Sequence, residues 1–396
     1  MKILVVSQYF YPESFRVNSF CLELKSRGHD VTVLTGYPQY PYGEIYEGYG
    51  FKVPYEKEWN GINVVRVKTT PRKKKPLGLI FNCTSFVSNG KKWVRKCKEK
   101  FDAIYVFEVS PVTVGLPAVA YKKKFGTPIY FNVQDLWPEN VEVILGIKNP
   151  LVIGVINKIV NKIYTASDKI LCSSMSFVNN LKEKGVDDIK LEFWPQFCDT
   201  PDVDSLKRPQ VLSEDTFNVV FTGNIGKTQG LDMLVEVADR MRETNLRYYI
   251  VGDGRHCDAL KLKIDDLGLN DKFVFTGWVS EEQANAFVHY ADCAYLSFVP
   301  NKVFNMTIPA KLQTYLVCGA PVLAAAGGES ARIIKDADCG IAVNPDTDSI
   351  IVALKYFMSL SKEELTKMSN NSRKYFDEHF TKKMLVDRFE ELLEEN

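Results

Sequence analysis

The chain has 396 residues, which is enough for two domains that each bury a core. Its 50 Lys and Arg residues against 49 Asp and Glu residues give a net charge of +1, so the overall charge indicates no class of partner. The nine cysteines are scattered without a Cys-x-x-Cys pair and the four histidines lack metal-ligand spacing, which predicts reduced thiols in a cytosolic protein and no metal site.

The first elements form a β-α-β unit. Residues 3–7 are a short apolar strand, 18–27 an amphipathic helix and 31–35 the next strand. This order predicts a parallel sheet in a doubly wound half, with ligands near the aromatic loop 8–16 at the end of the first strand. The opening strand does not read as a signal peptide, and no apolar run is long enough to predict a membrane span.

A basic segment follows the predicted loop 36–60 and the strand 63–68. Residues 68–100 contain eleven Lys and Arg residues and one Glu, with aromatic and aliphatic residues between them. Such a segment suits an anionic membrane surface, and equally a helix that packs on the domain with its basic face in water. No recognised nucleic-acid-binding module surrounds it, so we expect no nucleic-acid partner.

The rest of the first half continues the alternation, with strands at 103–107, 129–133 and 169–172. The helix 151–164 carries a broad apolar face that we expect to be core. That face comprises Leu151, Val152, Val155, Ile156, Ile159 and Ile163.

The chain changes character at residues 196–215, which are rich in Pro and Asp and are predicted to link two domains. The first domain then covers 1–195 and the second 216–378, and the helix in 379–396 is expected to pack back on the first. Predicted strands of the second domain are 217–221, 247–251, 273–275, 293–296, 321–324 and 340–343.

Glycine turns end several strands of the second half. Gly223 lies between the strand 217–221 and the helix 231–238, where a backbone can approach a phosphate and a helix start offers unpaired N–H groups. The turn is neither a P-loop nor a dinucleotide fingerprint, and an ordinary βα turn is the alternative. Similar turns at Gly252 and Gly277 end at the same predicted sheet edge and together favour a phosphate site.

On these residues the chain resembles family-4 glycosyltransferases of the GT-B fold. It is similar to bacterial enzymes that build capsule and O-antigen polysaccharides, near the fucosamine transferases. The resemblance implies an α/β fold with two doubly wound Rossmann-like domains that face each other across a cleft, the first binding the acceptor. The matching segments are 9–13, 27–31, 35–38, 134–139, 223–230, 252–254, 275–277, 309–312 and 319–323.

The resemblance also implies an activity. It implies a retaining transfer from a nucleotide sugar, a UDP-sugar, without cofactor or metal, onto an undecaprenyl-diphosphate-linked sugar. The enzyme would be cytoplasmic and peripherally attached to the inner face of the cytoplasmic membrane, with residues 68–100 on an anionic surface. A sugar-nucleotide 2-epimerase of the same fold and a catalytically inert sugar-nucleotide-binding protein are the alternatives.

Donor contacts are implied in the second domain, which departs from the family pattern in two respects. Asn224 and Gln229 stand where typical members have Arg and Lys, so the phosphate cation must come from elsewhere. Thr314 replaces a Glu that usually binds ribose. The candidates for donor contacts are Gly223, Asn224, Lys227, Gly252, Trp278, Val279, Lys302, Pro309, Lys311 and Thr314, and Arg16 is a further candidate cation.

Acceptor-side residues are implied in the first domain. Gln134 stands where many members have His, so no general base is expected there. Asp135 and Glu139 are expected to position a hydroxyl or stabilise positive charge on the sugar, and a helix cap is the alternative for Asp135. Glu13 and Arg16, in the loop after the first strand, complete the catalytic candidates, with a surface salt bridge as their alternative.

Overall fold

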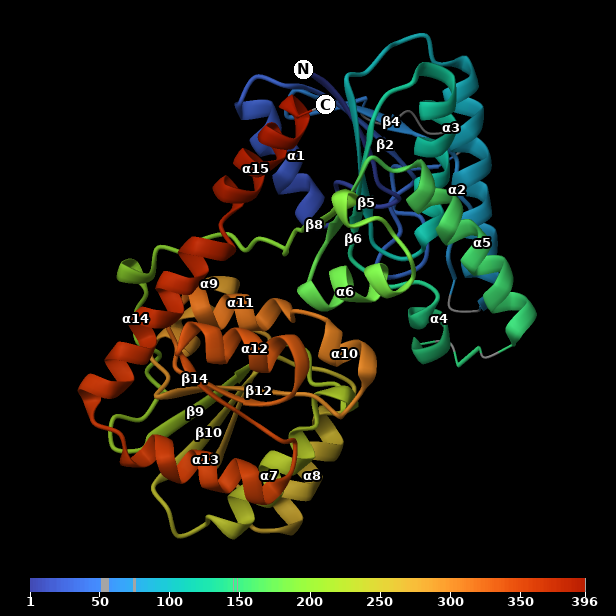
Figure 1. Cartoon of the computed structure of the whole chain (residues 1–396). Helices are drawn as coiled ribbons and strands as arrows, with labels where there is room; N and C mark the ends of the chain where they lie inside the picture. The colour runs from blue at the N-terminus through green and yellow to red at the C-terminus, as the bar shows by residue number, and fades with distance from the viewer. Residues whose placement is uncertain (51–56, 74–75, 145, 148, 396) are drawn as a thin grey trace. The chain divides into compact units, whose positions relative to one another are not determined.

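The computed structural model describes residues 1–50, 57–73, 76–144, 146–147 and 149–395. The chain divides into two compact units. The first unit is Met1–Trp194 together with Leu385–Asn396, and the second unit is Pro195–Met384. Each unit is a sheet flanked by helices (Figure 1).

The first unit contains an eight-stranded sheet in the order β3-β4-β2-β1-β5-β6-β7-β8. All neighbouring strands are parallel except the pair β3 and β4. Its strands are β1 (Lys2–Val6), β2 (Asp30–Thr35), β3 (Glu58–Trp59), β4 (Ile62–Arg66), β5 (Ala103–Glu108), β6 (Ile129–Val133), β7 (Lys169–Cys172) and β8 (Leu191–Phe193). The central strands are buried because helices cover both faces of a parallel sheet, as for every residue of β5.

The helices of the first unit connect these strands by crossovers. They are α1 (Arg16–Ser26), α2 (Pro76–Lys96), η1 (Val112–Val114), α3 (Gly115–Phe125), α4 (Glu139–Ile144), α5 (Pro150–Ala166), α6 (Met175–Glu183), η2 (Asp188–Lys190) and the terminal α15 (Lys382–Glu394). Strand β1 pairs with both β2 and β5, so the strand order reverses between β1 and β5. Loops that follow these two strands therefore flank the place where such sheets bind ligands.

The second unit contains a six-stranded parallel sheet in the order β11-β10-β9-β12-β13-β14. Its strands are β9 (Phe217–Thr222), β10 (Leu246–Val251), β11 (Phe273–Gly277), β12 (Cys293–Ser297), β13 (Val322–Ala325) and β14 (Gly340–Val343). Its helices are η3 (Val203–Ser205), η4 (Lys227–Gln229), α7 (Leu231–Arg240), α8 (Cys257–Asp266), α9 (Glu281–His289), α10 (Lys302–Met306), α11 (Ala310–Val317), α12 (Gly328–Ala337), α13 (Thr347–Ser359) and α14 (Lys362–His379). Here the strand order reverses between β9 and β12. Two doubly wound α/β units, the predicted fold class, are thus confirmed.

The segment predicted as a linker, 196–215, is packed within the second unit. Leu206 and Leu212 are buried, and the Tyr290 hydroxyl donates to the carbonyl oxygen of Leu206 at 2.9 Å. The backbone N–H of Ser213 donates to the Tyr249 hydroxyl at 2.9 Å. Apolar residues among the prolines attach this segment to the sheet and helices beside it.

The prediction that the apolar face of α5 is all core is wrong for its N-terminal half. Leu151 is 81% exposed, Val152 41% and Val155 59%, whereas Ile163 is buried. The physical reason is that the neighbouring helix α3 meets α5 only near its C-terminal end, at Ile163.

Part of two sequence predictions lies outside the described residues. These are residues 51–56 of the predicted loop 36–60, and Lys74 and Lys75 of the basic segment. The described part of the loop contributes β3 to the sheet. Within the described part of the chain, no helix combines the length and apolar character needed to cross a membrane.

Candidate active site

In the second unit, the turns after β9 and β12 meet at the point where the strand order reverses. The backbone N–H of Val299 donates to the carbonyl oxygen of Thr228 at 2.9 Å, and the Ser297 hydroxyl donates to the carbonyl oxygen of Gln229 at 2.5 Å. Parallel α/β sheets bind ligands at this edge, beyond the carboxyl ends of the strands. The turn Gly223–Gly230 therefore lies where the sequence predicts a phosphate site.

Most backbone N–H groups of this turn are already engaged. Those of Gly223 and Ile225 donate to the carbonyl oxygens of Val251 and Asp253 at 2.9 and 2.8 Å, and that of Gly226 donates to Asn224 at 3.1 Å. The N–H groups of Gly223, Ile225 and Gly226 are therefore not available to a phosphate in this conformation.

Gly252 allows the turn after β10 to pack closely against the turn after β9. Its φ is +126°, and a Cβ there would lie 2.2 Å from the carbonyl oxygen of Gly223. A side chain at 252 would thus collide with the neighbouring turn. The glycine predicted to approach a ligand instead lets the turn after β10 approach the turn after β9.

Lys311, in the first turn of α11, brings a positive charge to this edge. Its ammonium donates a hydrogen bond to the side-chain oxygen of Gln229 and lies 4.0 Å from the ring centroid of Phe221. A Cβ built at Gly223 would lie 3.8 Å from Lys311 Nζ. The lysine, the glutamine and the glycine turn therefore form one cluster.

Lys311 has no carboxylate partner within ion-pair distance among the described residues. Burial lowers the pKa of its ammonium to about 7. A buried charge normally requires a counter-ion, since desolvation disfavours the charged form. Lys311 is therefore the candidate cation for an anionic ligand next to the turn.

Tyr315, which the sequence analysis did not single out, positions this cluster. Its hydroxyl accepts from the backbone N–H of Thr222 and donates to the carbonyl oxygen of Tyr295, both at 3.1 Å. It therefore ties α11 to the ends of β9 and β12. The available signal was a tyrosine one helical turn after Lys311, on the same side of the helix.

The other donor candidates are distributed along the same edge. Pro309 is the N-cap of α11, and the Thr314 hydroxyl donates to the carbonyl oxygen of Ala310 at 3.4 Å. Trp278 is 76% exposed after β11, and Val279 packs partly on the core. Asn224, Lys227 and Lys302 are exposed as well, and the described contacts do not join Lys302 to the glycine turn.

Two carboxyl groups meet in the first unit at the ends of β5 and β6. The Asp135 carboxylate accepts from the backbone N–H and hydroxyl of Ser110 at 2.9 and 2.5 Å. Glu108 accepts from the backbone N–H groups of Gln134 and Asp135, each at 3.1 Å. The helix-cap alternative for Asp135 is wrong, because its carboxylate binds Ser110 and α4 begins only at Glu139.

Glu108 is a buried acid that the sequence analysis missed. Burial, followed by the charge of Asp135, raises the pKa of its carboxyl group well above the usual value. The signal was present, since Glu108 ends an apolar strand at the predicted ligand edge, as Asp135 nearly does. Perturbed acids at such an edge often belong to functional sites.

Glu13 is buried rather than part of a surface salt bridge, so that alternative is wrong. Its carboxylate accepts from the backbone N–H groups of Phe10, Gln39 and Tyr40 at 3.2, 2.8 and 2.7 Å. Burial raises the pKa of this carboxyl group. Glu13 thus holds the loop after β1 against the loop after β2, and Arg16 begins α1 just beyond it.

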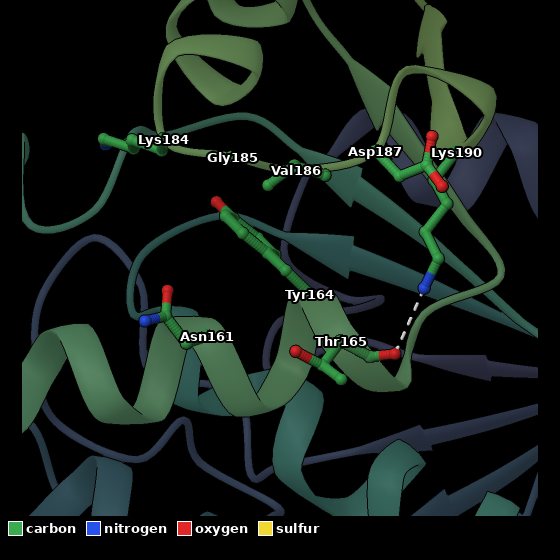
Figure 2. Close-up of a pocket in the computed structure, with 8 residues that line it drawn as sticks. All are labelled: Asn161, Tyr164, Thr165, Lys184, Gly185, Val186, Asp187 and Lys190. Atoms are coloured by element: carbon green, nitrogen blue, oxygen red, sulfur yellow. Dashed lines mark hydrogen bonds between the residues drawn. The ribbon is translucent and has the colours of Figure 1, made fainter.

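Glu139 pairs with Lys184 at 2.6 Å. Lys184 also lines a hollow of about 370 Å³ between α5 and the turn before β8. Figure 2 shows Tyr164 reaching from α5 toward the turn that holds Lys184 and Gly185. In the same view Lys190 donates to the carbonyl oxygen of Thr165. The first unit therefore brings Asp135 and Glu108 together and holds Glu139 in a separate ion pair.

Family models match the two halves of the chain. The model for Glycosyltransferase Family 4 matches residues 15–201, and the model for Glycosyl transferases group 1 matches residues 202–375. The chain is 25% identical to the putative colanic acid biosynthesis glycosyl transferase WcaI of Escherichia coli, over 98% of both chains. It is 21% identical to the probable glycosyltransferase WbjE of Pseudomonas aeruginosa, over 65% of this chain and 66% of WbjE.

Solved structures share the fold at low identity. HepE of Anabaena in complex with UDP has a TM-score of 0.71 at 14% identity, with 100% of both chains covered. WaaG, a glycosyltransferase involved in lipopolysaccharide biosynthesis, has a TM-score of 0.63 at 14% identity, with 95% of both chains covered. These likenesses show the GT-B fold that the resemblance predicted. With family models matching consecutively from residue 15 to residue 375, the chain belongs to the group 1 and family 4 glycosyltransferases.

Proposed function

We propose that the protein transfers a sugar, with retention, from a UDP-sugar to a lipid-linked saccharide during assembly of a surface polysaccharide. The second unit would bind the donor and the first unit the acceptor. WcaI is named for colanic acid biosynthesis and HepE was solved with UDP, which supports this class of pathway and donor. The observation that carries the proposal is the buried ammonium of Lys311, without a carboxylate partner among the described residues, beside the glycine turn.

The diphosphate of the donor would lie against Lys311 and the first turn of α11. In that turn the N–H group of Leu312 donates to the carbonyl oxygen of Pro309 at 3.0 Å, whereas the described contacts give no partner to the N–H groups of Ala310 and Lys311, as is usual at a helix start. Negative charge grows on the leaving phosphate as the glycosidic bond breaks, so a cation fixed there lowers the barrier. Gln229 and the Phe221 ring hold the ammonium in place before the donor arrives.

The acceptor would be positioned at the edge of the first sheet that carries Asp135. Ser110 and the buried Glu108 fix the orientation of Asp135, so its remaining acceptor capacity can hold a sugar hydroxyl or stabilise positive charge. With Gln134 in place of a histidine, the proton of the acceptor hydroxyl would pass to the leaving phosphate. Front-face displacement with retention requires no protein base.

A sugar-nucleotide 2-epimerase is the second candidate, because the pair Glu108 and Asp135 supplies carboxyl groups that such acid–base chemistry needs. Against it, Glu108 is completely buried and its carboxylate is bound by backbone N–H groups. The products decide between the two activities. Epimerisation releases an altered UDP-sugar without acceptor, whereas a transferase releases UDP.

The donor is tested by thermal shift with a panel of UDP-sugars that includes UDP-N-acetylfucosamine. Ligand binding raises the melting temperature by mass action, so the correct donor should stand out. Lys311→Met should lower the affinity for that donor by about tenfold to a hundredfold, which is the effect of losing a charged hydrogen bond. It should not destabilise the free protein, because it replaces a buried ammonium with an apolar chain of similar length.

Lys355→Met, an exposed lysine of α13, is the matched control and should bind the donor as the wild type does. Equal donor affinity for Lys311→Met and Lys355→Met would refute the role of Lys311. A panel in which no UDP-sugar raises the melting temperature would count against the UDP donor itself.

A further inference from the structure

Three helices lie side by side on one flank of the first sheet (Figure 1). The Lys124 ammonium at the end of α3 donates to the carbonyl oxygens of Val94 and Cys97 at the end of α2, at 3.1 and 2.6 Å. A Cβ at Gly90 of α2 would lie 2.8 Å from Pro117, near the start of α3. Helices α2 and α3 therefore run parallel with their C-terminal ends level.

Helix α5 joins the same layer from the other side. A Cβ at Gly115, the first residue of α3, would lie 2.9 Å from Ile163 of α5. Lys122, further along α3, donates to the carbonyl oxygen of Ala166 at 2.9 Å. Gly90 and Ile163 therefore lie at the level where α3 begins, which is just beyond the carboxyl end of β5.

The N-terminal parts of α2 and α5 consequently extend past this edge of the sheet. Residues 76–89 of α2 and 150–162 of α5 precede the level at which α3 starts. At 1.5 Å per residue, each overhang is about 20 Å long. Figure 1 shows the N-terminal end of α5 projecting beyond the strands.

The overhanging parts of both helices expose large apolar side chains, although the opposite face of α2 is packed, since Phe86 is buried and Asn82 donates to the carbonyl oxygen of Thr70 at 2.6 Å. Ile80 is 55% and Phe81 61% exposed on α2, while Leu151 is 81% and Val155 59% exposed on α5. Exposed aliphatic and aromatic residues that gather at helix ends require a partner more than scattered ones do. These four residues, with Val152, are called the apolar tips below.

Positive charge follows behind the apolar tips. On α5, Leu151, Val155, Lys158 and Lys162 are spaced by three or four residues, so they form one stripe that changes from apolar to cationic. Burial, followed by the charge of Lys162, lowers the pKa of Lys91 on α2, so the positive charges of the two helices are near enough to repel each other.

Acidic residues are absent from this layer. Helices α2, α3 and α5 together contain nine Lys and Arg residues and no Asp or Glu. Acidic residues near the overhang lie on other segments: Glu139 of α4 is paired with Lys184, Glu142 of α4 is exposed, and Asp187 lines the hollow beside Asn161 of α5. The layer thus presents a strongly cationic surface with an apolar end.

We propose that the overhanging ends of α2 and α5 dock the first unit on an anionic lipid bilayer. The apolar tips enter the interfacial region, and Lys158, Lys162 and the cations of α2 meet the lipid head groups. The overhang belongs to the sheet edge that carries Asp135, so docking would bring that edge toward the membrane. The lipid-linked acceptor comes from the proposed function, on which this inference rests. The docking surface itself is inferred from the geometry alone.

The charge also argues against a second copy of the chain as the occupant. A two-fold interface through this face would place the same cations opposite one another. The negative head groups of an anionic bilayer would instead neutralise these cations. Each Lys or Arg near such a surface strengthens binding by about fivefold, and each apolar side chain that enters the interface adds a comparable factor.

The test is flotation of the full chain with vesicles of phosphatidylglycerol and phosphatidylcholine, compared with phosphatidylcholine alone. The wild type should float with the anionic vesicles. Leu151→Ser with Val155→Ser, and separately Lys158→Glu with Lys162→Glu, should each weaken vesicle binding by about tenfold or more.

Matched controls lie on the second unit. Leu262 is 64% and Val352 69% exposed, so Leu262→Ser with Val352→Ser removes similar apolar surface outside the proposed site. Lys335→Glu with Lys355→Glu makes the same charge change at exposed positions of α12 and α13. Both controls should float as the wild type does.

Two outcomes would overturn the docking surface. One is flotation of the α5 variants equal to that of the controls. The other would be seen by light scattering without vesicles. If the wild type is a dimer and the variant Leu151→Ser with Val155→Ser is a monomer, the apolar tips are a protein interface. The UDP-sugar thermal shift of each variant is read in parallel, so loss of docking with intact donor binding separates this proposal from the proposed function.

Discussion

In the proposed donor site, Lys311 of α11 would supply the positive charge that the enzymes this chain resembles carry in the first glycine turn. Those enzymes have lysine at the position of Gln229, and here Gln229 accepts a hydrogen bond from Lys311. The sequence offered several cations for this role, including Lys227, Lys302 and Arg16. Spacing along the chain could not choose among them, since α11 begins some eighty residues after the turn it meets.

The pH dependence of donor binding should report Lys311. Burial lowers its pKa to about 7 in the free protein, and a bound diphosphate favours the charged ammonium. Donor binding should then take up a proton above pH 7, and the donor Kd should rise by up to about tenfold per pH unit between about pH 7 and 9. Calorimetry in buffers of different ionisation enthalpy measures this uptake.

Lys311→Arg is the control for that pH dependence. Its guanidinium remains charged throughout the range, so the donor Kd should be nearly independent of pH even if it is weaker. Wild-type affinity that stays constant from neutral to alkaline pH would contradict the assignment.

Glu108 illustrates the limit of sequence reasoning at a single position. The sequence placed Asp135 at the ligand edge because it follows a strand, and Glu108 meets nearly the same criterion. What the sequence could not show is that β5 and β6 are neighbours, which brings both acids together. That proximity, with burial, is what raises the pKa of Glu108.

At the scale of the element, the glycine turns of the second unit pack against one another. A Cβ at Gly254 would lie 2.3 Å from the carbonyl oxygen of Ile225, and one at Gly252 would lie 2.2 Å from that of Gly223. The sequence predicts a glycine turn at this sheet edge. It assigned the close approach to a ligand, although the neighbouring turn is what lies there.

Gly252→Ala should therefore destabilise the second unit by at least about 3 kcal/mol, from a left-handed φ and a backbone clash. It should also abolish the donor thermal shift, because the turn that holds Lys311 is displaced. Urea unfolding measures the first effect.

Gly185→Ala is the matched control for this change. Its φ is +81° and a Cβ there meets nothing within 4 Å, so it should cost only about 1 kcal/mol. Similar losses at both positions would mean that backbone conformation, and not turn packing, explains Gly252.

Helix α5 shows that a sequence pattern can also predict more burial than the structure provides. Its apolar periodicity predicts a buried face, and Ile163 fulfils that prediction. Leu151 and Val155 carry the same signal but extend past the neighbouring helix. Periodicity identifies which residues share a face, whereas the length of the adjacent element decides how much of that face is covered.

At the scale of the molecule, the C-terminal helix closes the first unit. Phe389 of α15 is buried, with ring centroids of Phe20, Tyr105 and Tyr130 at 5.5, 5.4 and 5.3 Å. The Tyr130 hydroxyl donates to the carbonyl oxygen of Leu392 at 2.8 Å. Residues from the end of the chain thus complete a core that its first strands begin.

Phe389→Ala should destabilise the first unit by about 3–5 kcal/mol, through the cavity left among these rings. Hydrogen exchange should show the loss at β5 and β6. Leu262→Ala, at an exposed position of the second unit, should leave exchange at these strands unchanged. Protection in Phe389→Ala equal to that in Leu262→Ala would show that the helix is not part of this core.

The sequence by itself determined the fold class, the family resemblance and the sheet edges at which ligands are expected, because strand and helix periods and strand-end turns are local properties. Tertiary structure decided which residues meet: Lys311 with Gln229, Glu108 with Asp135, and Phe389 with three rings. It also decided that half of α5 is uncovered. The physical reason is that contact, burial and charge coupling depend on strand order and on where each helix ends, which no local pattern records.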